Sequence, residues 1–135
     1  GIGTTLTANM LAMAALRAAL AEVAAAAAHE RMTRCCTQMA DGLRGAIARH
    51  GLPWCVTQVG ARCEFQFGAR APRNGSEAGA LARPALEHLV HLALLNRDVM
   101  ITPFHNMLLA SPVTSDGDVA RLLTAFDDVL AGLRA

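Results

Sequence analysis

The sequence contains no lysine and no tyrosine, and all twelve of its basic residues are arginine. Aromatic residues make up only 4% of the chain, so alanine and leucine supply most of the apolar side chains. The formal net charge of +1 argues against a surface that binds nucleic acid or an anionic membrane. A hydrophobic fraction of 53% over 135 residues predicts one folded domain with a substantial core.

Long leucine-rich runs are also missing. The most apolar stretch, residues 6–28, is mostly alanine and includes Asn9, Arg17 and Glu22. Alanine is a strong helix former but gains little from lipid, so we expect a soluble helix here and not a membrane span. No charged segment precedes a leucine-rich core in the manner of a signal peptide, and we expect a cytoplasmic protein.

The residues that commonly bind metals do not have a metal-site spacing. Cys35 and Cys36 are adjacent, so they would point about 100° apart on a helix, which suits neither a disulfide nor a zinc site. We expect these cysteines, with Cys55 and Cys63, to be small apolar residues in a reducing compartment. The EHLVH run at residues 87–91 differs from HExxH in its spacing, and we expect partly exposed helix residues and no metal.

Helical periodicity appears in four stretches. Thr7 or Asn9 can cap a first helix that runs to about residue 28, and a second stretch covers residues 26–50; the pattern leaves open whether these are one bent helix or two. A third helix is expected over residues 84–96. Ser115 and Asp118 predict a capping box at the start of the last helix.

Between these helices the hydrophobic period changes to two. Residues 54–59 and 62–67 predict two antiparallel strands joined by a turn at residues 60–61, and residues 68–76 predict a surface loop. Further short strands are expected at residues 99–102 and 107–110, on either side of a TPFHN loop. This order predicts an α+β fold in which helices pack on one face of a small antiparallel or mixed sheet.

Chemistry is harder to find in the residues alone. His105 lies in the TPFHN loop, and polar loop residues often carry function. The sequence shows no nucleophile elbow, no phosphate-binding loop and no convincing pair of carboxylates. The GIG at residues 1–3 lacks the preceding strand of a dinucleotide fingerprint. Without further information, the chain has no convincing catalytic set.

Two longer segments resemble a known family. GTTLTANMLAMAA resembles the segment G-T-(F/L/Y)-(S/T)-(G/A)-N-P-(L/I)-A-M-A-A of class III pyridoxal-phosphate aminotransferases, which joins their large cofactor domain to their C-terminal small domain. LLNRDVMITPFHNMLLASPVTSDGDVARLLTAF is similar to the tail of the glutamate-1-semialdehyde aminomutase branch. The resemblance implies that residues 1–135 are a single C-terminal small domain of a fold-type I enzyme, with residues 1–9 as the elbow to the large domain.

The resemblance also implies roles for residues of the elbow. In the family, the threonine that aligns with Thr5 hydrogen-bonds the phosphate of pyridoxal phosphate bound in the neighbouring subunit, and Thr4 lies beside it; this implies a homodimer. The alternative is that Thr5 and Thr7 only cap the helix. Because the cofactor chemistry needs a lysine amine, which this chain lacks, the chain alone is not expected to be a transaminase.

Departures from the family pattern bear on the reaction. The stretch MLLASPV has no arginine of the kind that many relatives use to bind the substrate's α-carboxylate, and Asn106 aligns with a position where the aminomutase usually has glutamate. These departures favour amino transfer from a different amine or β-amino acid, with His105 and Asn106 shaping the substrate pocket. A glutamate-1-semialdehyde-type aminomutase and a non-catalytic structural or interaction module are the alternatives.

Overall fold

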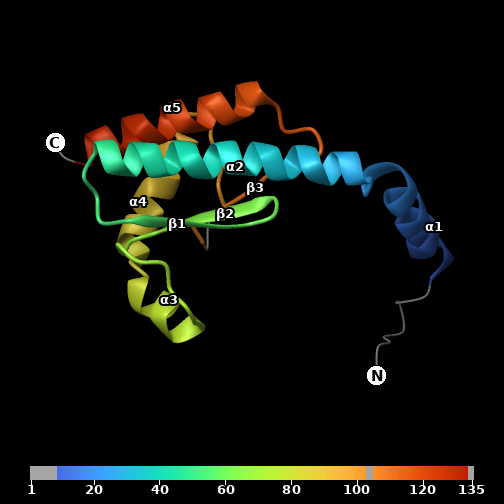
Figure 1. Ribbon diagram of the computed structural model, residues 1–135, viewed down its shortest axis with the longest axis horizontal. Helices are drawn as coiled ribbons and strands as arrows, with labels where there is room; N and C mark the ends of the chain where they lie inside the picture. Colours follow the sequence, from blue (N-terminus) through green and yellow to red (C-terminus); the bar gives the residue numbers. More distant parts are fainter. Residues whose placement is uncertain (1–8, 103–104, 134–135) are drawn as a thin grey trace.

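The computed structural model describes residues 9–102 and 105–133 and has an α+β fold, as the sequence predicts (Figure 1). The elements in chain order are α1 (Met10–Ala18), the π-helical turn η1 (Ala19–Val23), α2 (Ala26–Arg49), β1 (Cys55–Val59), β2 (Arg62–Gln66), α3 (Gly75–Leu81), α4 (Pro84–Leu95), β3 (Met107–Leu109) and α5 (Asp116–Gly132). The predicted elbow, residues 1–9, lies outside the described residues except for Asn9.

The three strands form one antiparallel sheet in the order β1-β2-β3. Gly60 has a φ of 55° and turns the chain between β1 and β2, as the sequence predicts. Val56 lies opposite Phe65, and Cys63 lies opposite Leu108. All four of these side chains are buried, so they define the core face of the sheet.

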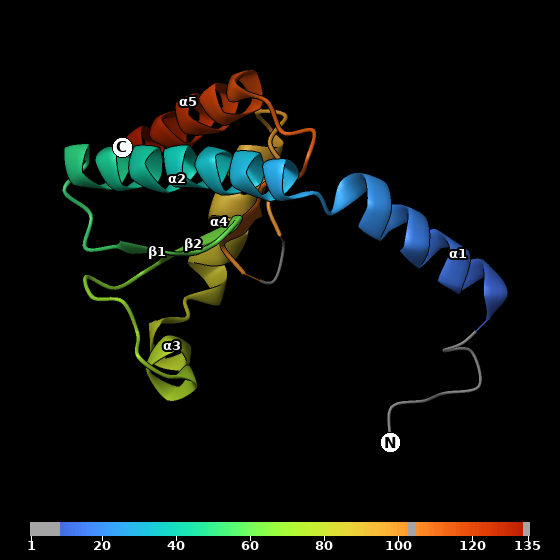
Figure 2. The ribbon, with the colours of Figure 1, turned by 45° about the vertical axis from the view of Figure 1, so that its right-hand side comes forward.

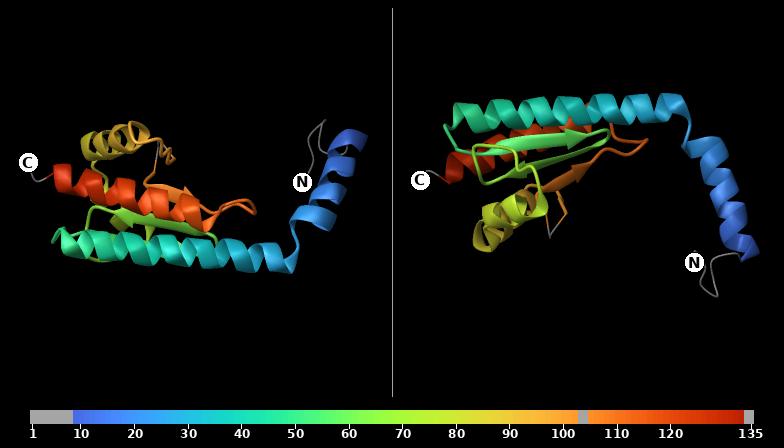
Figure 3. Two further views of the ribbon diagram at one scale, coloured as in Figure 1. Left: turned by 90° about the horizontal axis from the view of Figure 1, so that it is seen from above. Right: turned by 60° about the horizontal axis from the view of Figure 1, so that its bottom comes forward.

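Two long helices cover that face. Figures 1 and 3 show α2 and α5 side by side along the sheet, which confirms the predicted layer of helices on one face. Between the layers, Leu43 of α2 and Phe126 of α5 are fully buried, and the Phe126 ring centroid lies 5.1 Å from that of Phe65. Helix α4 packs against α5, and α3 lies beyond the sheet, away from α2 (Figure 2).

The N-terminal helical segment projects away from this core (Figures 1–3). Asn9 caps α1 by accepting a hydrogen bond from the Ala12 amide at 2.8 Å, and neither α1 nor η1 contains a buried residue. The predicted first helix ends at residue 23, earlier than expected. Ala25 is extended, and the helical axis bends by 71° before α2, so the stretch forms two helices.

No single helix among the described residues is both long and apolar enough to cross a bilayer. The segment Met10–Val23 and α2 are together long and apolar enough, but a 71° bend separates them.

One local prediction is wrong and a second is correct only in part. Residues 99–102 are not a strand; along this segment Thr102 donates one backbone hydrogen bond to the Met107 carbonyl, at 3.4 Å. The predicted loop at residues 68–76 is confirmed over residues 68–74, but helix α3 then begins, because Asn74 caps a helix start by accepting from the Glu77 amide at 2.9 Å. An asparagine–glycine pair that is typical of a turn therefore begins a helix here.

The last helix begins as predicted. The Ser115 hydroxyl accepts from the Asp118 amide at 3.2 Å, and Asp118 Oδ2 accepts from the Ser115 amide at 2.9 Å, which completes the capping box. These bonds from Ser115 lower the pKa of the Asp118 carboxyl, since they favour its charged form. The start of α5 is thereby fixed relative to the sheet.

The cysteines lie in or near the core, and all four are free thiols. Cys35, Cys36 and Cys63 are buried, whereas Cys55 is half-buried. Burial, reinforced by the neighbouring Cys36, raises the pKa of the Cys63 thiol to about 12. At neutral pH this thiol is protonated and behaves as a small apolar side chain, as expected from the sequence.

Candidate functional site

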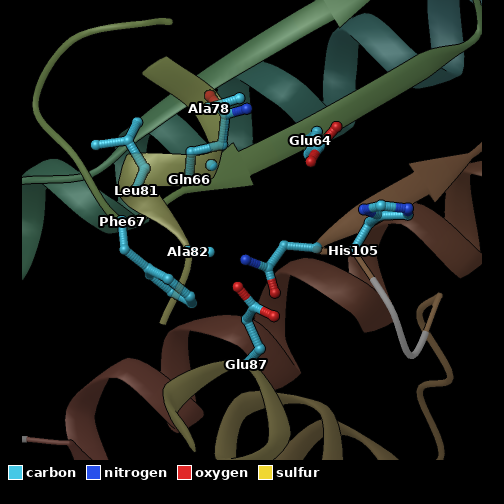
Figure 4. A pocket seen from close by; sticks show the side chains of 10 residues that line it. Glu64, Gln66, Phe67, Ala78, Leu81, Ala82, Glu87 and His105 are labelled. Carbon is cyan, nitrogen blue, oxygen red and sulfur yellow. The ribbon is translucent and has the colours of Figure 1, made fainter. Parts of the chain in front are cut away.

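A cavity of about 320 Å³ lies between strand β2, helix α3, the start of α4 and the residues just before β3 (Figure 4). Its lining brings together polar side chains from segments that are far apart in the chain. The lining residues are Glu64, Gln66, Phe67, Ala78, Gly79, Leu81, Ala82, Glu87, His105 and Asn106.

Local structure explains how the strand and helix residues reach the cavity. Because side chains alternate along β2, Glu64 and Gln66 lie on the face opposite the buried Cys63 and Phe65. Glu87 lies in the first turn of α4, where its Oε1 accepts a hydrogen bond from the Arg83 amide at 3.1 Å. The sheet and the helix start thus present polar groups to the same space.

The two residues predicted to shape a substrate pocket, His105 and Asn106, both line this cavity. The Asn106 carbonyl accepts a hydrogen bond from the Phe65 amide at 3.2 Å, which attaches the segment before β3 to β2. Asn106 is only 7% exposed, whereas His105 is exposed. No hydrogen bond joins the Asn106 side chain to any residue in the ranges 9–102 and 105–133.

The charge of the lining is negative. Its formally charged members are Glu64 and Glu87, and no arginine is among the residues that line it. Arg62 neutralises Glu64 in part, through an ion pair of 3.0 Å. Glu87 forms no ion pair with any residue in the described ranges, and its bond from Arg83 comes from a backbone amide.

Other residues singled out in the sequence lie elsewhere. Within the EHLVH run only Glu87 lines the cavity. His88 is exposed, and Nδ1 of His91 is buried without a hydrogen-bond partner among the residues that the structure describes. No group of three or more metal-ligating side chains occurs in the described parts of the chain. Thr4 and Thr5, the predicted cofactor-binding residues, lie outside the described residues.

Sequence reasoning did not identify Glu64, Gln66 and Glu87 as site residues. The signal for the first two was present, since the alternation of β2 already separates them from the core face. That α3 and α4 approach this open face of β2 depends on contacts between distant segments, which no local pattern encodes.

Comparisons with known proteins show where this fold occurs. No family model matches the chain. A glutamate-1-semialdehyde 2,1-aminomutase of Dechloromonas aromatica (strain RCB) is 26% identical over 130 residues, 96% of this chain and 30% of that protein. A glutamate-1-semialdehyde aminomutase from Pseudomonas aeruginosa PAO1, solved in complex with PMP, superposes on 98% of this chain and 29% of its own with a TM-score of 0.94 and 43% identity.

A more distant structure shares the fold. An omega-transaminase from Sphaerobacter thermophilus superposes on the whole chain and 31% of its own, with a TM-score of 0.83 and 22% identity. The chain thus spans about 30% of the length of the proteins that it matches.

Proposed function

Since the chain has the fold of the C-terminal part of a pyridoxal-phosphate-dependent aminotransferase or aminomutase, we propose that it completes the active site of a class III aminotransferase. The observation that carries this proposal is the match of 98% of the chain, at 43% identity, to 29% of the Pseudomonas aeruginosa aminomutase. The full-length enzyme would move an amino group from an amino acid or amine to an oxo acid or aldehyde.

The chain does not fit pyridoxal phosphate by itself. It contains no lysine, so the amine that bonds covalently to the cofactor must come from the large domain. The cavity beside β2 is also a poor place for the cofactor phosphate, because its formally charged lining residues are both glutamates. When bound in the full-length enzyme, the cofactor carries the amino group between donor and acceptor. In this proposal the small domain supplies a wall that faces the substrate.

Thr4 and Thr5 are our candidates for a contact with the cofactor phosphate across a dimer interface. Hydroxyl groups and backbone amides close to a helix start suit a phosphate, and α1 begins at residue 10. The homodimer that this contact requires has further support in the apolar side chains that α1 and η1 expose, such as Met10 and Leu11 at 83% and 81%. The four free cysteines favour a reducing compartment such as the cytoplasm.

An aminomutase is the second candidate function, favoured by the 43% identity to the Pseudomonas aeruginosa enzyme. Asn106, aligned where that branch usually has glutamate, favours the aminotransferase. The two reactions differ in their need for a second substrate: a transferase requires an amino acceptor, whereas an aminomutase moves the amino group within one molecule.

The test uses the full-length protein that contains this chain. We expect the purified protein to carry pyridoxal phosphate, detected by its visible absorbance, and to convert pyruvate to alanine with an amine donor. Conversion of glutamate-1-semialdehyde without any acceptor would identify an aminomutase. If the protein neither binds the cofactor nor transfers an amino group, the remaining interpretation is a non-catalytic structural or interaction module. Replacing Thr5 by alanine is expected to weaken cofactor retention about tenfold, the typical effect of losing a hydrogen bond to a charged group. Thr33→Ala, at an exposed position of α2, is the matched control.

A further inference from the structure

We propose that the cavity beside β2 binds a second, non-reacting ammonium group of the amino donor, so that the enzyme prefers donors with two amino groups. The inference rests on the proposed aminotransferase function and specifies its substrate class. It follows from three properties of the cavity: its charge, an asparagine amide to which no described residue hydrogen-bonds, and an apolar side.

The charge of the cavity selects for a cation. Glu87 has no cationic partner among the described residues, and its carboxylate points into the cavity in Figure 4. Glu64 lies on the same lining and is only partly neutralised by Arg62. An ammonium group placed here gains attraction from both carboxylates, and this attraction is stronger in a partly enclosed site than in water.

The amide of Asn106 independently indicates a polar ligand. Asn106 as a residue is 7% exposed and lines the cavity, and its side chain has no hydrogen bond to any residue that the structure describes. Its Oδ1 and Nδ2 are not among the fully buried side-chain atoms that lack a partner, so they keep contact with the open space and are available to bind water or a ligand. Asn106 Oδ1 can accept a hydrogen bond from an ammonium group, and the Glu87 carboxylate can accept another of its N–H donors.

The remaining walls suit a hydrocarbon chain. Phe67 and Leu81 stand on one side of the cavity in Figure 4, and His105 stands on the other. Ala78 and Ala82 add small apolar groups beside Leu81. Methylene groups between two amines would contact these side chains, while a terminal carboxylate in the same position would face two carboxylates, with no arginine among the residues that line the cavity.

The experiment compares three donors of equal chain length on the full-length, cofactor-loaded enzyme: cadaverine, pentylamine and δ-aminovalerate, each with pyruvate as acceptor. We expect kcat/KM to be highest for cadaverine and at least about tenfold lower for δ-aminovalerate. In the Glu87→Gln variant, the ratio of cadaverine to pentylamine should fall about tenfold, mainly through KM for cadaverine. Glu30→Gln, at an exposed position of α2, is the matched control and should leave both rates unchanged.

Failure of the inference can be told apart from failure of the proposed function. An active enzyme that prefers δ-aminovalerate, or one whose cadaverine-to-pentylamine ratio is the same in the wild type and in Glu87→Gln, refutes the inference alone. Absence of bound cofactor and of activity with every donor refutes the proposed function. If Glu87→Gln does not retain the cofactor, Glu64→Gln tests the same ratio, and an unchanged ratio there refutes the inference.

Discussion

Two glycines of helix α2, one turn apart, should respond in opposite ways to replacement by alanine. A Cβ at Gly42 would lie 2.9 Å from Cγ of Leu123 and closer still to the two methyl groups of that side chain, which is less than carbon atoms tolerate. A Cβ at Gly45 would have the guanidinium of Arg49 as its nearest neighbour, at an ordinary 3.5 Å. Only Gly42 therefore serves the close approach of α2 and α5.

The expected magnitudes follow from two opposing effects. Alanine stabilises the interior of a helix by about 1 kcal/mol relative to glycine. Overpacking at a helix contact costs about 1–3 kcal/mol. Gly45→Ala is thus expected to raise the free energy of unfolding by about 1 kcal/mol, and Gly42→Ala to lower it by about 1 kcal/mol. In a Leu123→Ala background the contact is removed, and Gly42→Ala should become stabilising by about 1 kcal/mol.

Urea denaturation of the 135-residue chain measures these changes. Trp54 is the sole tryptophan, and its ring centroid lies 4.7 Å from that of Phe67 and 6.1 Å from that of Phe65, so its fluorescence reports loss of the core. Equal shifts of the two glycine variants, or a Gly42→Ala effect that is the same with and without Leu123, would refute the proposed packing of α2 against α5.

Two further predictions concern stability. Phe65 is fully buried between the sheet and α5, so Phe65→Ala should lower the free energy of unfolding by about 3–5 kcal/mol in the same assay; Leu109→Ala, at a side chain 61% exposed, should change it by less than about 0.5 kcal/mol. Hydrogen bonds from Arg49, and secondly from His50, lower the pKa of the Asp127 carboxyl. The charged Asp127 carboxylate therefore contributes fully to the free energy of unfolding above its unfolded-state pKa of about 4. This contribution is lost as the pH falls through the lower folded-state pKa. The stability difference between wild type and Asp127→Asn should shrink between pH 6 and pH 3, and a constant difference would contradict this assignment.

Elements with a strong local signal were predicted well. The alternation of Cys63 and Phe65 with polar residues identified β2 and its buried face, because a strand with one buried face needs that period. Ser115 and Asp118 identified the start of α5, because a capping box is made within four residues. The resemblance to aminotransferases and aminomutases, stated from short motifs, agrees with the relatives found.

Features without such a signal were left open or missed. The sequence left open whether residues 10–50 form one bent helix or two, because the bend between η1 and α2 lies within an alanine run, residues 24–28, and no glycine or proline marks it. Asn74 and Gly75 suit a turn and a helix start equally well, and the bond from the Glu77 amide to Asn74 decides for the helix. Residues 99–102 have the composition of a strand, but only one backbone bond links them to β3, so no strand forms.

The sequence by itself determined the α+β class, the core faces of the sheet and of α5, and the absence of a lysine for cofactor chemistry. It also identified His105 and Asn106 as candidate pocket residues. These properties depend on residue identity and on spacing within a few positions. Only the tertiary structure decided that Glu64 and Glu87, which are 23 positions apart, share a cavity with Asn106. That proximity arises from the packing of α3 and α4 near the open face of β2, and such contacts depend on the whole chain.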